Sequence, residues 1–242
     1  MDPQWLMIAE IALTFVLSWL VYRLHCLSKS GAVASTVVGI LLAVFGSFSA
    51  FFIMTFFVIM SFFATMRDID RKVEMGLQEG QFGERGWKNV AAVAFPPVLI
   101  TIVHYFTGFD QATYVIMFLT SVVVAGSDTI ASEMGVKDPK TYLITTFERV
   151  PPGTDGGISL FGTLVSTIAA LVIAVIGWAI MAQTVHWAVL IPFAFGVFGN
   201  LLDSVFGALI ERKGLISKYT NNWSTELISA LLAGGFWILV HG

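Results

Sequence analysis

The stretch ATYVIMFLTSVVVAGSDTI, residues 112–130, decides the fold class of this chain. It carries a single charged residue, Asp128, and it matches the roughly 20 apolar residues that a helix needs to cross a bilayer. Seven similar apolar runs fall at about residues 5–22, 31–48, 50–66, 89–106, 158–181, 187–208 and 225–240. The sequence therefore predicts an all-α polytopic membrane bundle of about eight transmembrane helices, with residues 1–242 forming a single integral membrane domain.

The composition excludes several other classes of protein. Of the 242 residues, 57% are hydrophobic and only 12% are charged, whereas a soluble domain has about a quarter charged residues. A soluble enzyme and a disordered chain are therefore excluded. The net charge of −3 provides no cationic field for a nucleic acid. With one cysteine, Cys26, neither a disulfide scaffold nor a multi-cysteine metal site can form.

The basic residues predict the orientation in the membrane. All 13 lysines and arginines lie after the first, third, fifth or seventh apolar run, so eight crossings place them on one face. The positive-inside rule makes that face cytoplasmic and puts both termini on the opposite side. The long loops of the cytoplasmic face, at about residues 67–88, 131–157 and 209–224, hold most of the polar residues. We expect the active site there.

An internal repeat is visible between the second and sixth runs. Residues 31–46 align without gaps on residues 162–177, with matching Gly, Ser-Thr, Ala-Val and Gly positions. This match predicts two parallel four-helix halves, residues 1–107 and 108–242. The alternative is a chance similarity between two membrane helices rich in small residues.

Two acidic residues inside the apolar runs are candidate metal ligands. Asp128 follows Ser121 and Ala125 at helical spacing, and Asp203 follows Gly196 and Asn200 in the same way. Small residues let helices approach closely, so the two faces are expected to meet with Asp128 and Asp203 together. Two adjacent carboxylates repel unless a cation lies between them, and Mg²⁺ binds one or two carboxylates plus phosphate oxygens. The alternative is that the small residues only serve helix packing and that the two Asp side chains extend to the membrane surface.

Three more polar residues bear on this site. Asn200 is a further candidate ligand. Glu133 lies roughly 140° around an ideal helix from Asp128, so both reach one ion only if the helix breaks near Gly126 or after Ala131. Glu226, just inside the last run, is expected to pair with a Lys or Arg of the cytoplasmic face.

A glycine-rich loop precedes the sixth run: RVPPGTDGGIS, residues 149–159. It leads into the N-terminus of a helix, where exposed N–H groups and the helix dipole suit a phosphate. Thr154 and Ser159 add hydroxyl groups, and Arg149 is the nearest basic partner. Lys140, Lys72 and Arg85 are further basic candidates, although each alone also fits a role in topology. The alternative for the loop is a tight turn whose glycines serve packing.

Together these motifs resemble the family of integral membrane proteins that includes the phytyl-phosphate kinases of tocopherol biosynthesis, with a more distant similarity to dolichol kinases and CDP-diacylglycerol synthases. The resemblance rests on residues 126–135, 145–146, 150–159, Asp203-Ser204 with Gly207, and 221–222. Lys72 and Arg85 also resemble family positions. We expect roles in nucleotide or substrate binding for residues in these segments and for the basic candidates Lys72, Arg85 and Lys140. The set is Gly153, Thr154, Asp155, Gly156, Gly157, Ser159, Ser132, Lys72, Arg85, Lys140, Asn221 and Asn222.

The resemblance implies transfer of the γ-phosphoryl of CTP or another NTP to a prenyl monophosphate, with Mg²⁺. Asp128, Asp203 and Arg149 are then the catalytic residues, and Asp128, Asp203, Glu133 and Asn200 are the candidate metal ligands. The expected partners are a prenyl phosphate, a nucleotide and the membrane; a homodimer is compatible with this prediction. Two alternatives stay open: a CTP-dependent cytidylyltransferase acting on a lipid phosphate, and an ion or lipid transporter.

Overall fold

The helices of the computed structural model coincide with the predicted apolar runs. The structure describes residues 3–67, 69, 73 and 83–241. Within this part of the chain, seven helices are long and apolar enough to cross a membrane, and an eighth apolar helix has 17 residues. The predicted all-α membrane bundle is therefore confirmed, and the protein is an integral membrane protein. Its orientation in the membrane stays a prediction.

The chain divides into two compact units, Met1–Gly108 and Phe109–Gly242. Their boundary falls beside that of the predicted repeat halves, whose equivalence stays a prediction. The two helices that contain the aligned segments 31–46 and 162–177 are capped in the same way. Ser28 Oγ accepts a hydrogen bond from Gly31 N (3.2 Å), and Ser159 Oγ accepts one from Gly162 N (3.0 Å). Each serine thus satisfies an N–H group that the first helical turn leaves unpaired.

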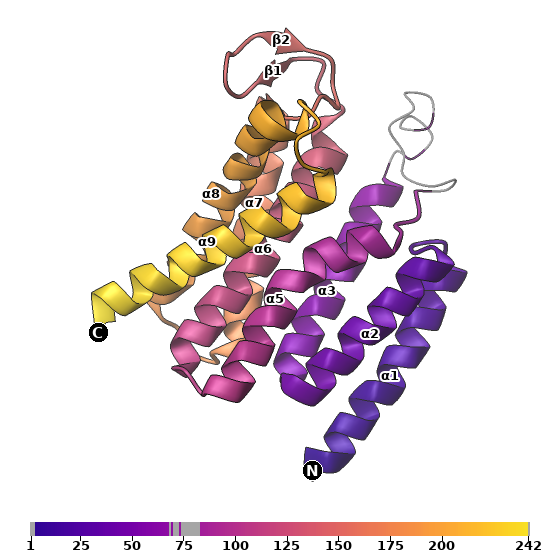
Figure 1. The fold of residues 1–242 in the computed structure, drawn as a ribbon, viewed down its shortest axis with the longest axis vertical. Helices are drawn as coiled ribbons and strands as arrows, with labels where there is room; N and C mark the ends of the chain where they lie inside the picture. The colour runs from indigo at the N-terminus through magenta and orange to yellow at the C-terminus, as the bar shows by residue number, and fades with distance from the viewer. Residues whose placement is uncertain (1–2, 68, 70–72, 74–82, 242) are drawn as a thin grey trace. The chain divides into compact units, whose positions relative to one another are not determined.

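The described residues of the first unit form helices α1, α2, α3 and α5 (Figure 1). In it α2 packs against both α1 and α5 and also contacts α3. Glycines permit the close contacts: a Cβ at Gly39 of α2 would overlap the side chain of Thr14 in α1. The bounds are α1 (Pro3–Arg23), α2 (Lys29–Phe45), α3 (Phe48–Met66) and α5 (Trp87–Thr107).

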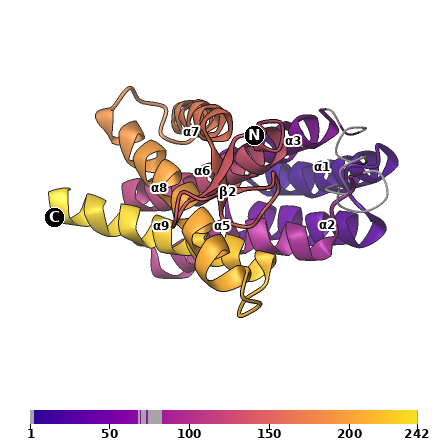
Figure 2. The same cartoon turned by 90° about the horizontal axis from the view of Figure 1, so that it is seen from above.

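The second unit is built around α6 (Gln111–Gly135), which packs against α7, α8 and α9 (Figures 1 and 2). Because it is covered on these sides, most of α6 between Thr113 and Thr129 is buried. At its start, Asp110 accepts hydrogen bonds from the Thr113 N–H (2.9 Å) and hydroxyl, which lower the pKa of this carboxyl. The surrounding segments are α7 (Leu160–Met181), η1 (Trp187–Val189), α8 (Leu190–Phe206), the π-helical η2 (Gly207–Glu211) and α9 (Lys218–His241).

The loop between α6 and α7 contains a small antiparallel sheet that the sequence analysis did not predict. Its strands are β1 (Thr141–Leu143), β2 (Arg149–Val150) and β3 (Gly157–Ser159), in the order β2-β1-β3. Thr141 is opposite Val150 on one side and Ser159 on the other. Strands of two or three residues are too short to show the alternation of apolar and polar residues that signals a strand.

Close contact between α6 and α8 depends on a glycine, which gives a testable prediction. A Cβ at Gly196 of α8 would overlap the branched side chain of Val123 in α6, whereas a Cβ at Gly235 of α9 meets nothing within 4 Å. We expect Gly196→Ala to destabilise the protein by about 1–3 kcal/mol, because an overpacked interface must shift. Gly235→Ala, the matched control, should be neutral or stabilising by up to about 1 kcal/mol. Thermal unfolding in detergent measures both, and equal unfolding temperatures would contradict this account of the interface.

Candidate functional site

Asp128 of α6 and Asp203 of α8 lie close together in the second unit, within electrostatic range of each other. Both side chains are half-buried. α8 packs tightly against α6 at Gly196 and Gly199, whose missing side chains make room for Val123 and Val124 of α6. The packing of these small residues therefore brings together two carboxylates of like charge, which raises their energy unless a cation neutralises them.

Glu226 of α9 is the third acid of this site, and it does not pair as the sequence analysis expected. Its side chain is 1% exposed, and among the described residues neither carboxylate oxygen has a hydrogen-bond partner. Among the described residues, the charged groups that act on it are Asp128 and Asp203. Burial of a carboxyl group without a partner is costly, so Glu226 indicates a place for a bound cation or a proton. The sequence feature that marks Glu226 as a candidate site residue is the same as for Asp128: an acidic residue within an apolar run.

Asn221 and Thr225, on the first turns of α9, hold Asp203 in place. Asn221 Nδ2 donates to the backbone carbonyl of Asp203 (3.1 Å) and to Glu211 Oε2 (2.9 Å), while Thr225 Oγ1 donates to Asp203 Oδ2 (3.2 Å). The amide oxygen of the same side chain, Asn221 Oδ1, is buried and has no hydrogen-bond partner among the described residues. Asn221 was predicted to bind substrate, and here its nitrogen is structural while its oxygen is an available ligand.

The π-helical segment η2 connects this network to the glycine-rich loop. Arg212 N donates to Gly207 O (3.0 Å), five residues earlier, and Glu211 at the end of η2 accepts from Asn221. Single π-helical turns inside helices are frequent at functional sites. Sequence reasoning did not place Glu211 or Lys218 in the site, although Lys218 lies within electrostatic range of both Glu211 and Asp203.

The glycine-rich loop docks directly on η2. A Cβ at Gly156 would lie 2.5 Å from Ala208 N, and one at Gly207 would lie 2.8 Å from Gly156 N. Gly156 also has a positive φ of 74°, which favours glycine. These two glycines thus allow close packing, which is the alternative to phosphate binding given above for the glycine-rich loop. The same packing brings Asp155 within electrostatic range of Glu211.

Part of the predicted phosphate-binding surface of the loop is occupied by internal hydrogen bonds. Gly157 N donates to Thr154 O (2.8 Å), and the Thr154 hydroxyl donates to Pro151 O (2.7 Å). Ser159 Oγ accepts from Gly162 N as the cap of α7. Gly153, at the turn, is exposed and has a φ of 83°. The role of residues 153–159 in phosphate binding therefore stays a prediction.

The remaining candidates are dispersed. Because α6 is unbroken to Gly135, Glu133 stays roughly 140° from Asp128, so the condition for its joining the same ion is not met. Asn200 Nδ2 donates to Ser166 Oγ of α7 (3.0 Å), which links α7 to α8. Ser132 Oγ donates to Thr129 O (3.0 Å) and is exposed.

The candidate cations divide between the two units. Arg149 and Lys140 are exposed around the small sheet, where Arg149 Nη2 donates to Pro139 O (3.2 Å). Arg85 belongs to the first unit, and Lys72 lies outside the described residues. Asn222 is half-buried and joins the network of α9 through its backbone carbonyl, which accepts from Thr225 Oγ1 (3.1 Å).

The oxygen donors of this site fit a hard divalent cation bound together with a ligand. Within residues 3–67, 69, 73 and 83–241, no three His, Cys, Asp or Glu side chains stand close enough to enclose an ion by themselves. Mg²⁺ does not need such a cage, since it retains several waters and combines one or two carboxylates with phosphate oxygens. The unpartnered oxygens of Glu226 and Asn221 beside Asp128 and Asp203 are the observation that favours a cation here.

The fold and this polar site define a polytopic membrane protein with an acidic centre at one end of its second unit. Comparison of the sequence with protein families agrees: the chain belongs to the family described as integral membrane protein DUF92, whose model matches residues 12–234.

Curated relatives cover most of the chain. An uncharacterised membrane protein of Methanocaldococcus jannaschii is 34% identical over 96% of this chain and 93% of its own length. Protein VTE6, chloroplastic, of Arabidopsis thaliana is 30% identical over 89% of this chain and 65% of its own length. Protein PGR of the same plant is 26% identical over 89% of this chain and 83% of its own. No solved structure matches the chain.

The structural role of Asn221 can be tested against its neighbour in the sequence. Asn221→Ala removes the two hydrogen bonds that link α9 to Asp203 and to the Glu211 carboxylate. We expect a loss of about 1–3 kcal/mol of stability, because one of these bonds is to a charged group. Asn222→Ala should have little effect, since Asn222 contributes its backbone carbonyl. Thermal unfolding compares the two variants. An equal loss of stability in both would refute the structural role of the Asn221 side chain.

Proposed function

We propose that this protein is a membrane kinase that transfers the γ-phosphoryl group of a nucleoside triphosphate, CTP being the first candidate, to a prenyl monophosphate. The observation that carries the proposal is the meeting of Asp128, Asp203 and the buried, unpartnered Glu226 beside the glycine-rich loop. The resemblance of residues 126–135, 150–159 and 203–207 to phytyl-phosphate kinases supports it, as does membership of an integral membrane protein family.

The chemistry of the acceptor explains why this site needs no general base. A phosphate monoester has a second pKa near 6, so it is largely a dianion at pH 7. A non-bridging oxygen of the prenyl phosphate attacks the γ-phosphorus, and the bond from that phosphorus to the β–γ bridging oxygen breaks. The products are the prenyl diphosphate and a nucleoside diphosphate, with no proton transferred. Such a reaction depends on positioning and on neutralisation of charge.

The charge balance of the site calls for added cations. Asp128, Asp203, Glu211, Glu226 and Asp155 are all acidic, and among the described residues Lys218 is a basic group in electrostatic range of Asp203 and Glu211. A triphosphate would be repelled from this arrangement without a counter-ion. Asp128 and Asp203 would hold Mg²⁺, with Asn221 as a further oxygen donor and the charge of the buried Glu226 beside them. When bound, Mg²⁺ neutralises charge on the phosphate oxygens during transfer.

The rest of the site has roles in orientation. Thr225 and Asn221 hold Asp203 through its carboxylate and its carbonyl, which limits its rotation. The contact of Gly156 with Ala208 keeps the glycine-rich loop beside the acids. Lys218, Arg149 and the exposed turn at Gly153 are the groups of this region that suit nucleotide phosphates.

Isotope labelling tests the proposed reaction. Purified protein in nanodiscs receives geranylgeranyl monophosphate, Mg²⁺ and CTP labelled at either the α or the γ phosphorus. We expect label in the lipid from the γ position alone. Asp203→Asn should reduce this transfer by about 100-fold or more, since it removes a charge at the reacting centre. Asp110→Asn is the matched control and should retain activity, because Asn still caps α6.

Other outcomes of the same experiment identify the alternatives. Label from the α position would indicate a cytidylyltransferase and overturn the kinase proposal. Absence of both labels with several nucleotides and prenyl chain lengths would also overturn it. A transporter would instead show ion or lipid flux in liposomes that is lost in Asp128→Asn, without nucleotide turnover in the parent protein.

The buried carboxylate of Glu226 is expected to contribute to Mg²⁺ binding. Glu226→Gln removes one negative charge from the buried acids while preserving the shape of the side chain. We expect the Mg²⁺ concentration for half-maximal activity to rise by about tenfold, because one negative charge is lost beside the two aspartates that attract the cation. Glu10→Gln replaces another buried glutamate, 4% exposed on α1 of the first unit, and should leave the Mg²⁺ dependence unchanged. A titration of Mg²⁺ in which both variants behave as wild type would remove Glu226 from the site.

A further inference from the structure

The small sheet before α7 has one buried face and one exposed face. Along β1, Thr141 and Leu143 are buried and Tyr142 is 39% exposed, because successive side chains of a strand point to opposite faces. Tyr142 is opposite Arg149 of β2 and Ile158 of β3, and residues opposite each other lie on the same face. Arg149, Tyr142 and Ile158 therefore form a row across the exposed face, with the aromatic residue at its centre.

The turn between β1 and β2 displays a second aromatic ring. Phe147 is 73% exposed, and its φ of 57° lies in the left-handed region that a bulky residue rarely adopts. Hydrogen bonds hold the turn: Phe147 N donates to Leu143 O (2.8 Å). Thr146 Oγ1 accepts from Glu148 N (3.3 Å) and donates to Glu148 Oε2 (3.2 Å). An aromatic side chain, with only two rotatable bonds, on such a turn binds a flat ligand at low cost in conformational entropy.

Phe147 lies at the end of the sheet away from the membrane helix. Thr141 is opposite Ser159, directly before the start of α7. Leu143 is opposite Gly157 at the other end of the sheet, and Phe147 bonds to Leu143. An aromatic residue that anchors a protein in the membrane surface is expected at the end beside the membrane helix. The position of Phe147 therefore favours a ligand from the aqueous phase.

The same end of the sheet is attached to the acidic site of the second unit. Ile144 N donates to Gly156 O (3.0 Å), and Gly156 packs against Ala208 of η2. Glu211, also on η2, is within electrostatic range of Asp128. Figure 1 shows β1 and β2 at the end of this unit where α9 begins. A ligand bound on the sheet can thus extend to the acids.

We propose that Tyr142 and Phe147 form the platform on which the base of the nucleoside triphosphate stacks, with its phosphates directed toward Arg149 and the acidic site. Aromatic side chains bind nucleobases by stacking on their π-faces, and a guanidinium binds phosphate oxygens through paired hydrogen bonds. The identity of the ligand as a nucleotide rests on the proposed function. The choice of these two rings rests on their exposure, on the register of the sheet and on its attachment to η2.

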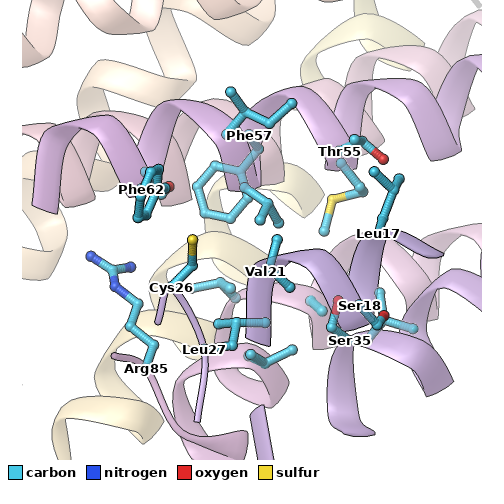
Figure 3. A pocket seen from close by; sticks show the side chains of 18 of the residues that line it. Leu17, Ser18, Val21, Cys26, Leu27, Ser35, Thr55, Phe57, Phe62 and Arg85 are labelled. Atoms are coloured by element: carbon cyan, nitrogen blue, oxygen red, sulfur yellow. The ribbon is translucent and has the colours of Figure 1, made fainter. Parts of the chain in front are cut away.

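The cavity of the first unit is too small to be the nucleotide site. Figure 3 shows it between side chains that include Leu17, Val21 and Phe57, and Arg85 also lines it. Its volume is about 130 Å³, whereas a dry cavity of roughly 150 Å³ holds one benzene molecule. A nucleoside triphosphate is several times the size of benzene and does not fit there.

Binding measurements separate the base from the phosphates. Purified protein in nanodiscs, with Mg²⁺ and without a lipid substrate, receives radiolabelled CTP in competition with unlabelled CTP or inorganic tripolyphosphate. Tripolyphosphate has three linked phosphates and no base. We expect Phe147→Ala and Tyr142→Ala each to weaken the binding of CTP by about tenfold, because each removes a stacking surface. The affinity for tripolyphosphate should stay unchanged.

Conservative variants distinguish stacking from a structural role. Phe147→Tyr and Tyr142→Phe keep an aromatic ring and should bind CTP as the wild type does. Phe106→Ala is the matched control and should leave both affinities unchanged, since Phe106 is 72% exposed on α5 of the first unit. Arg149→Gln should weaken CTP and tripolyphosphate by the same factor, because the guanidinium binds phosphate. A wild-type unfolding temperature shows that a variant is folded, and either alanine variant that passes this check serves.

The remaining outcomes separate this inference from the proposed function. Unchanged CTP affinity in the folded alanine variants, or an equal loss for CTP and tripolyphosphate, would overturn the platform even if the parent protein transfers the γ-phosphoryl group. Absence of binding by CTP, ATP, GTP and UTP to the wild type would overturn it as well. The expected pattern in a protein that transfers no phosphoryl group would support the platform while the proposed function fails.

Discussion

The close approach of Asp128 and Asp203 is the constraint on which the second unit depends. Charged groups inside a membrane protein are costly, and two of like sign together are costlier still. The helices nevertheless bring them together, because glycines on α8 allow it to pack directly against Val123 and Val124 of α6. The burial of Glu226 beside the same pair adds a third acid. An arrangement this unfavourable on its own is consistent with a site completed by a cation.

The polar groups around the pair are organised to hold it rather than to neutralise it. Asn221 and Thr225 of α9 fix Asp203, and the same Asn221 reaches Glu211 on the π-helical segment. That segment in turn forms the surface against which Gly156 packs. A side chain at Gly156 or Gly207 would separate the loop from η2. Helices α6, α8 and α9 and the loop before α7 therefore meet at one site, although they are distant in sequence.

Sequence reasoning predicted the features that depend on helical periodicity and hydrophobicity. The apolar runs located the helices, and the matched spacing before Asp128 and Asp203 predicted that these acids meet. It could not locate Glu226, Glu211 or Lys218 in the site, because their positions follow from the crossing of α9 and from a π-helical turn that changes the helical phase. Nor could it separate a phosphate-binding glycine from a packing glycine, since both are selected for a missing side chain.

Two further differences have simple physical causes. The loop before α7 contains strands of two or three residues, which carry too few positions to show a pattern. Glu133 was considered as a ligand on the condition of a break in the helix, and α6 continues past it because residues 126–135 include no proline to interrupt the helix. The cavity beside Arg85 could not be predicted from the sequence, since its lining residues come from α1, α2, α3 and α5 and share no common motif.

The central claim is that Asp128 and Asp203 bind one divalent cation together. Electron paramagnetic resonance of Mn²⁺, a spectroscopic substitute for Mg²⁺ with the same preference for oxygen ligands, tests it directly on the purified protein with CTP present. The account predicts one tightly bound Mn²⁺ in the wild type, bound more weakly in each single Asp→Asn variant and lost in the double variant. Unchanged Mn²⁺ binding in Asp128→Asn/Asp203→Asn would contradict it.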